Sequence, residues 1–518
     1  MEPNYKRVRR ALQEFSLEDS LLHIWQYSRL ISGGIRLPVT YNHVERGVAR
    51  HIENHVHAHE LDLLAREMIL HASRSNKPFK SSISSWQGAA NAFNAIKEYG
   101  SGVVDLKNED LMLVIHRIAH QQFPKFSRLN SSKIGRYLAL YRHPPLRALF
   151  EQRLGIDVDA YFVLSMAVLG SVMRQARMNT TTDFSILGVD PDQSRRFFSR
   201  ISGHVDVIAA KLRDDQQLNS RWEYTLNALH FLPLVALDET HLERVYCPLP
   251  QALEARLIEG TYFDIYRRKD EQFDQAYGGA VEALVGRMLK SLPKRYSFTK
   301  PEPVVLKKEI YHLCDWVVSD ESAVAYIECK AKRIALKGRV AATLDDLQTE
   351  LQFLAEAVRQ NYANMLRMNE DIHGAGEEKP RSYCLVVTLE DWILFSDSAV
   401  STLHRLVAEE LVKYGLPQNL PSVAPYLILS AETFQQCMPA LSSHSIQKVF
   451  GSIESPEYKG WAFSTYLARH FPGMDARDVG GFHGEATELF EPFLSRFKPE
   501  GTALSHIAPM PAAALTKN

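Results

Sequence analysis

The chain has 518 residues, of which 45% are hydrophobic, 23% are charged and 10% are aromatic. This composition is typical of a folded globular protein and excludes a disordered or collagen-like chain. The formal net charge is −1, so any contact with nucleic acid must depend on a local basic patch. Single hydrophobic cores stop growing at roughly 250–300 residues, so we expect more than one domain.

The five cysteines are scattered, without a Cys-x-x-Cys pair. This pattern argues against a disulfide framework and against a structural zinc site. The first 20 residues lack the apolar run of a secretory signal, and no apolar run reaches the roughly 18 residues that a membrane-spanning helix needs. We therefore expect a cytoplasmic protein without a membrane partner.

Residues 1–250 show apolar residues at helical spacing, separated by turn signals. The clearest predicted helices are 17–31, 62–72, 109–119, 132–141 and the apolar stretch 160–173, which is too short for a membrane and predicts a buried helix. This pattern predicts an all-helical N-terminal domain, and we expect it to recognise substrate, a protein partner or a trigger.

Three histidines in this region, His51, His55 and His59, fall four residues apart on one helical face. Such spacing can bind a metal. A histidine stripe that faces solvent or a partner is the more common reason for this pattern.

From residue 251 to 505 the pattern predicts an α/β domain with a mixed sheet and helical additions, followed by a disordered tail over 506–518. The predicted elements are a helix at 273–292, strands at 303–313, 315–320 and 323–334, a helix at 344–368, a strand at 383–389, a helix at 398–411 and a strand at 425–431. Residues 320–322 predict a hairpin turn between the second and third strands.

The segment from Asp315 to Lys330 carries the residues most suited to chemistry. Residues two apart on a strand share a face, so Glu328 and Lys330 project together, and the turn at 320–322 brings Asp315 back towards them. Two carboxylates suit Mg²⁺, which prefers oxygen ligands, and the backbone carbonyl of Cys329 offers a further one. The ammonium group of Lys330 can orient a water or stabilise phosphoryl charge.

These residues resemble the PD-(D/E)XK nuclease superfamily of restriction-endonuclease-like enzymes. Asp315 matches the Asp of that pattern, and Glu328-Cys329-Lys330 matches its E-x-K, while Cys314 stands where the pattern has Pro. The resemblance covers roughly residues 270–435, where the predicted order is similar to the superfamily's αβββαβ core. Asp, Glu and Lys at this spacing are weakly specific alone, and an ordinary solvated hairpin is the alternative, but here the charges interrupt an apolar strand, where unpaired charges are costly.

The resemblance implies that Asp315 and Glu328 bind Mg²⁺, for which Mn²⁺ can substitute, and that Lys330 serves the attacking water or the phosphoryl charge. Many members carry a Glu on the preceding helix, and Glu282 stands at that place, which implies an outer or second metal ligand. Relatives also place a supporting Gln or Tyr on the next helix, where Gln360 lies.

Basic residues gather around this segment. From 287 to 339 there are 12 Lys and Arg against 6 Asp and Glu. Such residues supply non-specific contacts with a phosphate backbone, although lysines at strand edges also merely solubilise. The candidate DNA-contacting residues are Lys307, Lys308, Lys332, Arg333, Lys337 and Arg339.

The sequence thus predicts a Mg²⁺-dependent endonuclease that hydrolyses phosphodiester bonds in DNA. A nuclease core behind a long helical region is similar to effectors of prokaryotic restriction or anti-phage defence, and a DNA repair or recombination nuclease is the nearest alternative. A non-catalytic nucleic-acid-binding or scaffold protein that keeps the fold is the rival of another class. Cleavage of both strands would favour a homodimer.

Overall fold

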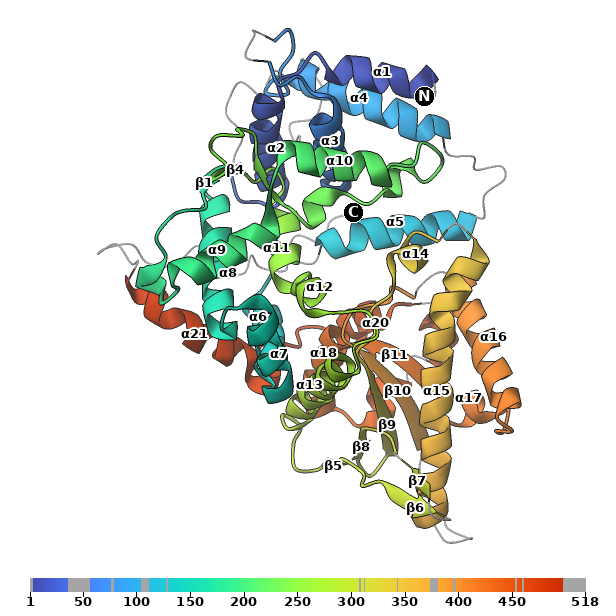
Figure 1. Cartoon of the computed structure of the whole chain (residues 1–518). Coiled ribbons are helices and arrows are strands. Elements are labelled where there is room, and N and C mark those ends of the chain that lie inside the picture. Colours follow the sequence, from blue (N-terminus) through green and yellow to red (C-terminus); the bar gives the residue numbers. More distant parts are fainter. Residues whose placement is uncertain are drawn as a thin grey trace.

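The computed structural model describes residues 3–35, 56–75, 79–103, 111–126, 129–306, 309–311, 313–341, 343–372, 381–394, 397–451, 454–458 and 461–496. Within these ranges the chain is a mixed α/β protein (Figure 1). The helices α1 and α4 lie at one end of the molecule, and a five-stranded sheet lies towards the other (Figure 1).

The first 246 residues are mainly helical. Their helices are α1 (Pro3–Leu12), α2 (Leu17–Ile31), α3 (Ala58–His71), α4 (Trp86–Val103), α5 (Leu111–Phe126), α6 (Ser131–Arg142), α7 (Pro144–Leu154), α8 (Val158–Val172), α9 (Pro191–Ile201) and α10 (Val205–Asp215), with short 3₁₀ helices η3 (Ser185–Leu187), η4 (Trp222–Tyr224) and η5 (Ala228–His230). The predicted helix at 17–31 is confirmed as α2, where the Ser16 side chain accepts a hydrogen bond from the backbone N–H of Asp19 and so caps the helix.

The prediction that this region is all-helical is wrong. It contains a four-stranded sheet in the order β1-β4-β3-β2, made of β1 (Arg177–Asn179), β2 (Ser202–His204), β3 (Leu234–Ala236) and β4 (Arg244–Tyr246). Each strand has only three residues, which is too short to show the alternation of apolar and polar residues that identifies a strand.

The most apolar stretch of the chain forms α8, as predicted. Asp157 caps the start of the helix, because its side chain accepts hydrogen bonds from the backbone N–H groups of Asp159 and Ala160. Most residues of the helix are buried. No single helix in the described ranges has both the length and the apolar character to cross a membrane. Only α7 and α8 together reach that threshold, with a bend of 64° between them.

The rest of the described chain holds the larger sheet. Its elements are α11 (Pro250–Ile258), α12 (Thr261–Ile265), α13 (Glu271–Leu289), β5 (Ser297–Thr299), β6 (Val304–Leu306), β7 (Glu309–Tyr311), β8 (Trp316–Ser319), β9 (Ala323–Lys330), α14 (Leu336–Arg339), α15 (Leu344–Ile372), β10 (Arg381–Thr388), α16 (Asp397–Lys413), α17 (Leu420–Val423), β11 (Tyr426–Ser430), α18 (Ala431–Ser443), α19 (Ile446–Gly451), η7 (Pro456–Tyr458), α20 (Phe463–His470), η8 (Val479–Gly481) and α21 (Phe482–Arg496).

The five-stranded sheet is mixed, as predicted. Its order is β11-β10-β9-β8-β5, in which β5, β8 and β9 run antiparallel and β9, β10 and β11 run parallel. The prediction of one strand at 303–313 is wrong, because β6 and β7 pair only with each other as a separate ribbon. The edge strand beside β8 is instead the three-residue β5, which the sequence pattern did not identify.

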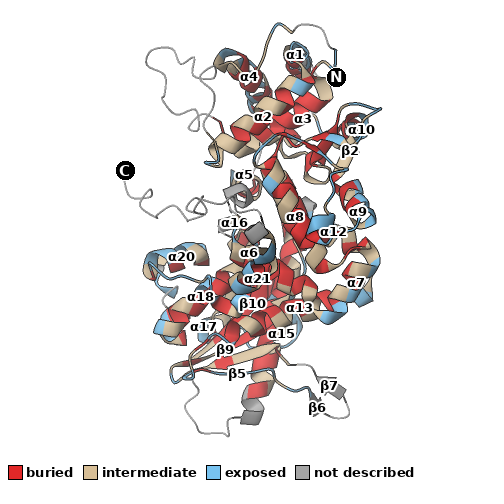
Figure 2. Ribbon diagram, turned by 90° about the vertical axis from the view of Figure 1, so that its left-hand side faces the viewer, coloured by how far each residue is buried: buried red, intermediate tan, exposed pale blue. Residues whose placement is uncertain are grey.

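The sheet lies between two layers of helices, and its central strands β9 and β10 are mostly buried (Figures 1 and 2). Ala325 and Ile327 of β9 pack into a core that includes α13 and α18. Tyr326, which points to the opposite face, packs into a core that includes α15 and α16. The alternation of β9 therefore places Glu328 and Lys330 on the same face as Tyr326, towards α15.

The buried side chains of the two halves are interleaved. One continuous core runs from Ile134 to Ala486 and joins α6, α7 and α8 to the elements around the large sheet, while a second core collects α1 to α4 with α10. Helices far earlier in the chain are therefore in contact with the sheet domain. The predicted boundary near residue 250 stays a prediction.

Candidate active site

The hairpin of β8 and β9 brings Asp315 to Glu328. The register pairs Trp316 with Ile327, so the preceding residue, Asp315, lies opposite Glu328. The backbone N–H of Asp315 donates to the carbonyl of Ile327 at 3.0 Å, and the backbone N–H of Cys329 donates to Asp315 Oδ2 at 2.6 Å. The predicted approach of Asp315 to the E-x-K segment is therefore present.

The turn that makes this approach possible is held by Asp320. Its Oδ1 accepts hydrogen bonds from the backbone N–H groups of Ser322 and Ala323, at 2.8 and 3.0 Å. Its Oδ2 accepts from the backbone N–H of Ile446 at 2.8 Å. A single aspartate thus closes the hairpin and ties it to α19, which is the behaviour expected of Asp in a tight turn.

Glu328 is a buried carboxylate, with only 4% of its surface exposed. Its Oε1 accepts from Lys330 Nζ at 2.7 Å, whereas its Oε2 is buried with no hydrogen-bond partner among the described residues. Lys330 Nζ also donates to Gln360 Oε1 on α15 at 3.1 Å. Gln360 therefore contacts the ammonium of Lys330, and its supporting role stays a prediction. One carboxylate oxygen of Glu328 has no partner among the described residues, which is costly unless a cation joins it.

The carboxylates of Asp315 and Glu328 are both buried, and their charges repel each other. Burial raises the pKa of Asp315 to about 7, helped by the charges of Glu328 and Glu282 and opposed by the Cys329 amide and by Lys330. Burial likewise raises the pKa of Glu328, although Lys330 opposes that shift. A divalent cation would offset both shifts, because it favours the charged form of each carboxylate.

Glu282 lies at the rim of this group. Its Oε2 accepts from Lys300 Nζ at 2.7 Å, and its charge raises the pKa of both Asp315 and Glu328. Trp316 Nε1 donates to the carbonyl of Glu282 at 3.1 Å, so this contact holds α13 against β8. The predicted metal-ligand roles of Glu282 and of the Cys329 carbonyl stay predictions.

Over the described part of the chain, one group of three potential ligands has all its ligand atoms within 4.8 Å of one another, namely His204, Asp206 and Glu239. It lies beside the small sheet rather than at the E-x-K strand. Asp206 and Glu239 are exposed, and Asp206 is ion-paired with Arg74. Exposed acidic groups of this kind are common without a metal, so this group carries no assignment. Of the predicted histidine stripe, His51 and His55 lie outside the described residues, and His59 stacks on His57.

Arg333 does not occupy the surface position that a DNA contact needs. Its side chain is only 9% exposed and is ion-paired with Glu390. It donates to the carbonyl of Glu259 at 2.8 Å, and its guanidinium lies 5.1 and 4.9 Å from the rings of Tyr262 and Phe263. The interpretation of Arg333 as a DNA contact is therefore corrected: it connects the segment after β9 to α11 and α12.

The other predicted basic residues differ in their accessibility. Arg339 also binds Glu390, at 3.2 Å. Lys332 is 44% exposed, with its Nζ 3.9 Å from Glu350 Oε2 and 4.6 Å from the centre of the Phe353 ring. Lys307 and Lys308, and the side chain of Lys337, lie outside the described residues. Lys332 is thus the predicted residue whose observed position best suits a phosphate contact.

Helix α5 contacts the segment that follows β9. His116 Nε2 is 2.9 Å from the carbonyl of Gly338, and Arg117 Nη1 donates to the carbonyl of Ala341 at 3.0 Å. Both side chains are buried. The end of the segment 331–341, which follows the E-x-K strand, is therefore held by α5 from the first half of the chain.

Glu254 on α11 is a titratable group in this contact region. Burial and the charge of Glu259 raise its pKa to about 7, although Lys133 opposes the shift. Because the folded protein holds this proton more tightly than the unfolded chain, the stabilisation is complete below about pH 4.5 and is lost as pH rises through about 7. Between pH 5 and pH 8 the free energy of unfolding of the wild type is therefore expected to fall by about 1–3 kcal/mol more than that of Glu254→Gln, which has no proton to lose at this position. Urea unfolding of both proteins at pH 5 and pH 8 measures this difference. An identical pH dependence of stability in the two proteins would contradict a raised pKa for Glu254.

Two residues beside the site have contacts that the sequence pattern does not reveal. Lys300, which directly follows β5, belongs to the basic segment whose residues could contact a phosphate backbone, but the pattern gives no sign that it pairs with Glu282. His143, between α6 and α7, lies against α13, where a Cβ added to Gly279 would be 3.7 Å from His143 Cε1. Its position depends on contacts between segments more than 130 residues apart, which no local pattern reveals.

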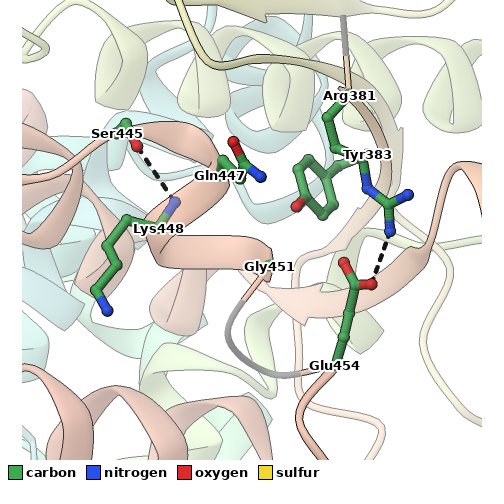
Figure 3. Close-up of a pocket in the computed structure, with 7 residues that line it drawn as sticks. All are labelled: Arg381, Tyr383, Ser445, Gln447, Lys448, Gly451 and Glu454. Carbon is green, nitrogen blue, oxygen red and sulfur yellow. Dashed lines mark hydrogen bonds and ion pairs between the residues drawn. The ribbon is translucent and has the colours of Figure 1, made fainter.

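A pocket of about 520 Å³ lies at the other end of the sheet (Figure 3). It is lined by residues at the start of β10 and around α19, among them Arg381, Tyr383 and Lys448. Arg381 pairs with Glu454 at 2.7 Å across it (Figure 3). Since β9 and β10 are parallel and Arg381 pairs with Ala323, seven residues before Lys330, this pocket is separate from the carboxylate group.

The candidate site therefore consists of Asp315, Glu328, Lys330 and Gln360, contributed by the β8–β9 hairpin and α15, with Glu282 at its rim. These residues are brought together by the sheet register and by the packing of α15 on the sheet. Comparisons with family models, with curated proteins and with solved structures found no match to this chain.

Proposed function

We propose that the protein is a metal-dependent nuclease that hydrolyses phosphodiester bonds in DNA. The observation that carries the proposal is Glu328, a buried carboxylate with one unpartnered oxygen, beside Asp315 and 2.7 Å from Lys330. Such an arrangement is unfavourable for the folded protein on its own. Sites that cost stability and perturb pKa values are typical of functional centres.

The order of elements supports the same proposal. Helix α13 precedes the antiparallel strands β5, β8 and β9, and α15 connects β9 to the parallel strand β10. This order resembles the αβββαβ core of the PD-(D/E)XK superfamily. Asp315 directly precedes β8, the second of these strands, and Glu328 and Lys330 lie at the end of β9, the third.

Asp315 and Glu328 would hold Mg²⁺ or Mn²⁺, with the Cys329 carbonyl and Glu282 as further oxygen donors, and the ion would supply positive charge that polarises the phosphoryl oxygen and acidifies a bound water. Lys330, oriented by Glu328 and Gln360, places an ammonium where phosphoryl charge develops. In the reaction, a water oxygen forms a new bond to phosphorus and the bond to the leaving sugar oxygen breaks. The attacking water gives up a proton as it bonds to phosphorus, and the leaving oxygen takes one up.

The experiment that tests this function uses a supercoiled plasmid and an RNA of similar length. Each is incubated with the purified protein in Mg²⁺, in Mn²⁺ and in EDTA. We expect nicked or linear plasmid with either metal and none with EDTA. Cleavage that continues in EDTA, or a failure to cleave either nucleic acid with either metal, would contradict the proposal.

A further inference from the structure

Lys300 lies at the border of the carboxylate group. It comes directly after β5, the edge strand of the sheet, and its Nζ is 2.7 Å from Glu282 Oε2. Trp316, which directly follows Asp315, donates its Nε1 hydrogen to the backbone carbonyl of Glu282 at 3.1 Å, so the Lys300–Glu282 pair lies beside the start of β8. The ammonium group is therefore within electrostatic reach of the proposed catalytic centre, and it is not merely part of a remote surface pair.

The centre contains two lysines, and they are held differently. Lys330 is 20% exposed and contacts both Glu328 and Gln360. The Lys300 side chain is 58% exposed and pairs with Glu282 at the rim. Because a lysine ammonium moves on a flexible four-carbon stem, Lys300 can exchange partners without disturbing the sheet.

We propose that Lys300 is an exchangeable cation of this centre. In the metal-free protein it neutralises Glu282, and when metal and DNA are bound it releases Glu282 and contacts a DNA phosphate. This inference rests on the proposed nuclease function and adds to it a residue that links metal binding to DNA binding. The ordinary alternative is a surface ion pair, which contributes little and is coupled to neither ligand.

The first test is a titration of Mn²⁺ into the protein without DNA. Lys300→Met removes a cation that competes for Glu282, so Mn²⁺ affinity is expected to rise about twofold to fivefold, the worth of one exposed pair. Lys97→Met is the matched control, because Lys97 Nζ is also 2.7 Å from a glutamate, Glu60, and is 45% exposed. Lys97 belongs to α4, at the far end of the molecule (Figure 1), and its substitution should leave Mn²⁺ affinity unchanged.

The second test measures DNA affinity against salt concentration, in a Lys330→Ala background that prevents cleavage. Loss of one phosphate contact reduces the slope of log affinity against log salt by about 0.9. Lys300→Met is expected to show that reduction in Mg²⁺ and to show none in EDTA, where Lys300 is still paired with Glu282. Lys300→Arg, which keeps the charge, is expected to preserve the slope in Mg²⁺.

Two results would overturn the inference. Unchanged Mn²⁺ affinity and an unchanged salt slope in Lys300→Met would show an ordinary surface pair, and an equal loss of slope in Mg²⁺ and EDTA would show a permanent phosphate contact instead of an exchange. These results leave the nuclease proposal standing as long as the wild-type protein cleaves DNA. Failure of the wild-type protein to cleave would be a failure of the proposed function itself.

Discussion

Glu328→Gln is expected to lower metal-dependent cleavage by about 10³-fold or more, because it removes the charge that would hold the metal and that positions Lys330. The amide has nearly the same size as the carboxylate, so the packing around β9 should remain. Cleavage rates at saturating Mg²⁺ measure the effect on chemistry, and a Mn²⁺ titration measures the effect on metal affinity.

The same substitution is expected to leave metal-free stability unchanged or raised. Burial already disfavours the charged form of Glu328, and glutamine carries no charge to bury. Thermal unfolding in EDTA would therefore separate loss of activity from loss of structure. Glu409→Gln is the control, since Glu409 is exposed on α16 and pairs only with Arg405 among the contacts described. A Glu328→Gln protein with more than a tenth of wild-type activity would contradict the assigned role.

Arg333→Met is expected to have the largest effect on stability. It leaves Glu390 without its buried partner and removes the contact with the Glu259 carbonyl. Breaking a buried pair in this way costs about 3–5 kcal/mol. Urea unfolding monitored by circular dichroism measures the loss, and Arg339, which also reaches Glu390, sets how much of it is recovered.

The control for this prediction is Arg405→Met. Arg405 pairs with Glu409 on the surface of α16, and an exposed pair one helical turn apart is worth about 0.3–0.5 kcal/mol. If Arg333→Met were as stable as Arg405→Met and yet bound DNA more weakly, Arg333 would be a DNA contact and not a connector. The structure predicts the opposite: unfolding at lower urea concentration, and any loss of DNA binding secondary to it.

The part of the site that was predictable from sequence is the part built by neighbouring residues. Asp320 encodes the turn, apolar residues encode both strands of the hairpin, and the alternation of β9 puts Glu328 and Lys330 on one face. The long amphipathic pattern after it likewise predicts α15. Gln360 was found only through the resemblance, because its contact with Lys330 depends on how that helix packs.

The predictions that were wrong concern features that neighbouring residues do not determine. A strand of three residues, such as β5, is too short to show a sequence pattern. The sequence therefore predicted a strand at 303–313 in this part of the sheet, where the structure has β5. Arg333 stands in a basic segment, and only the packing of α11 and α12 shows that it is covered. Long-range contacts decide whether a charged residue faces solvent or a partner, and the local sequence does not predict these contacts.

The proposal that Asp315, Glu328 and Lys330 form a hydrolytic centre can be tested in a single assay. Supercoiled plasmid is incubated in Mg²⁺ with wild-type protein, with Lys330→Ala and with Lys97→Ala, each purified identically and shown to be folded. We expect cleavage by the wild type and by Lys97→Ala and none by Lys330→Ala. Equal cleavage by Lys330→Ala, or no cleavage by the wild type, would contradict the proposal.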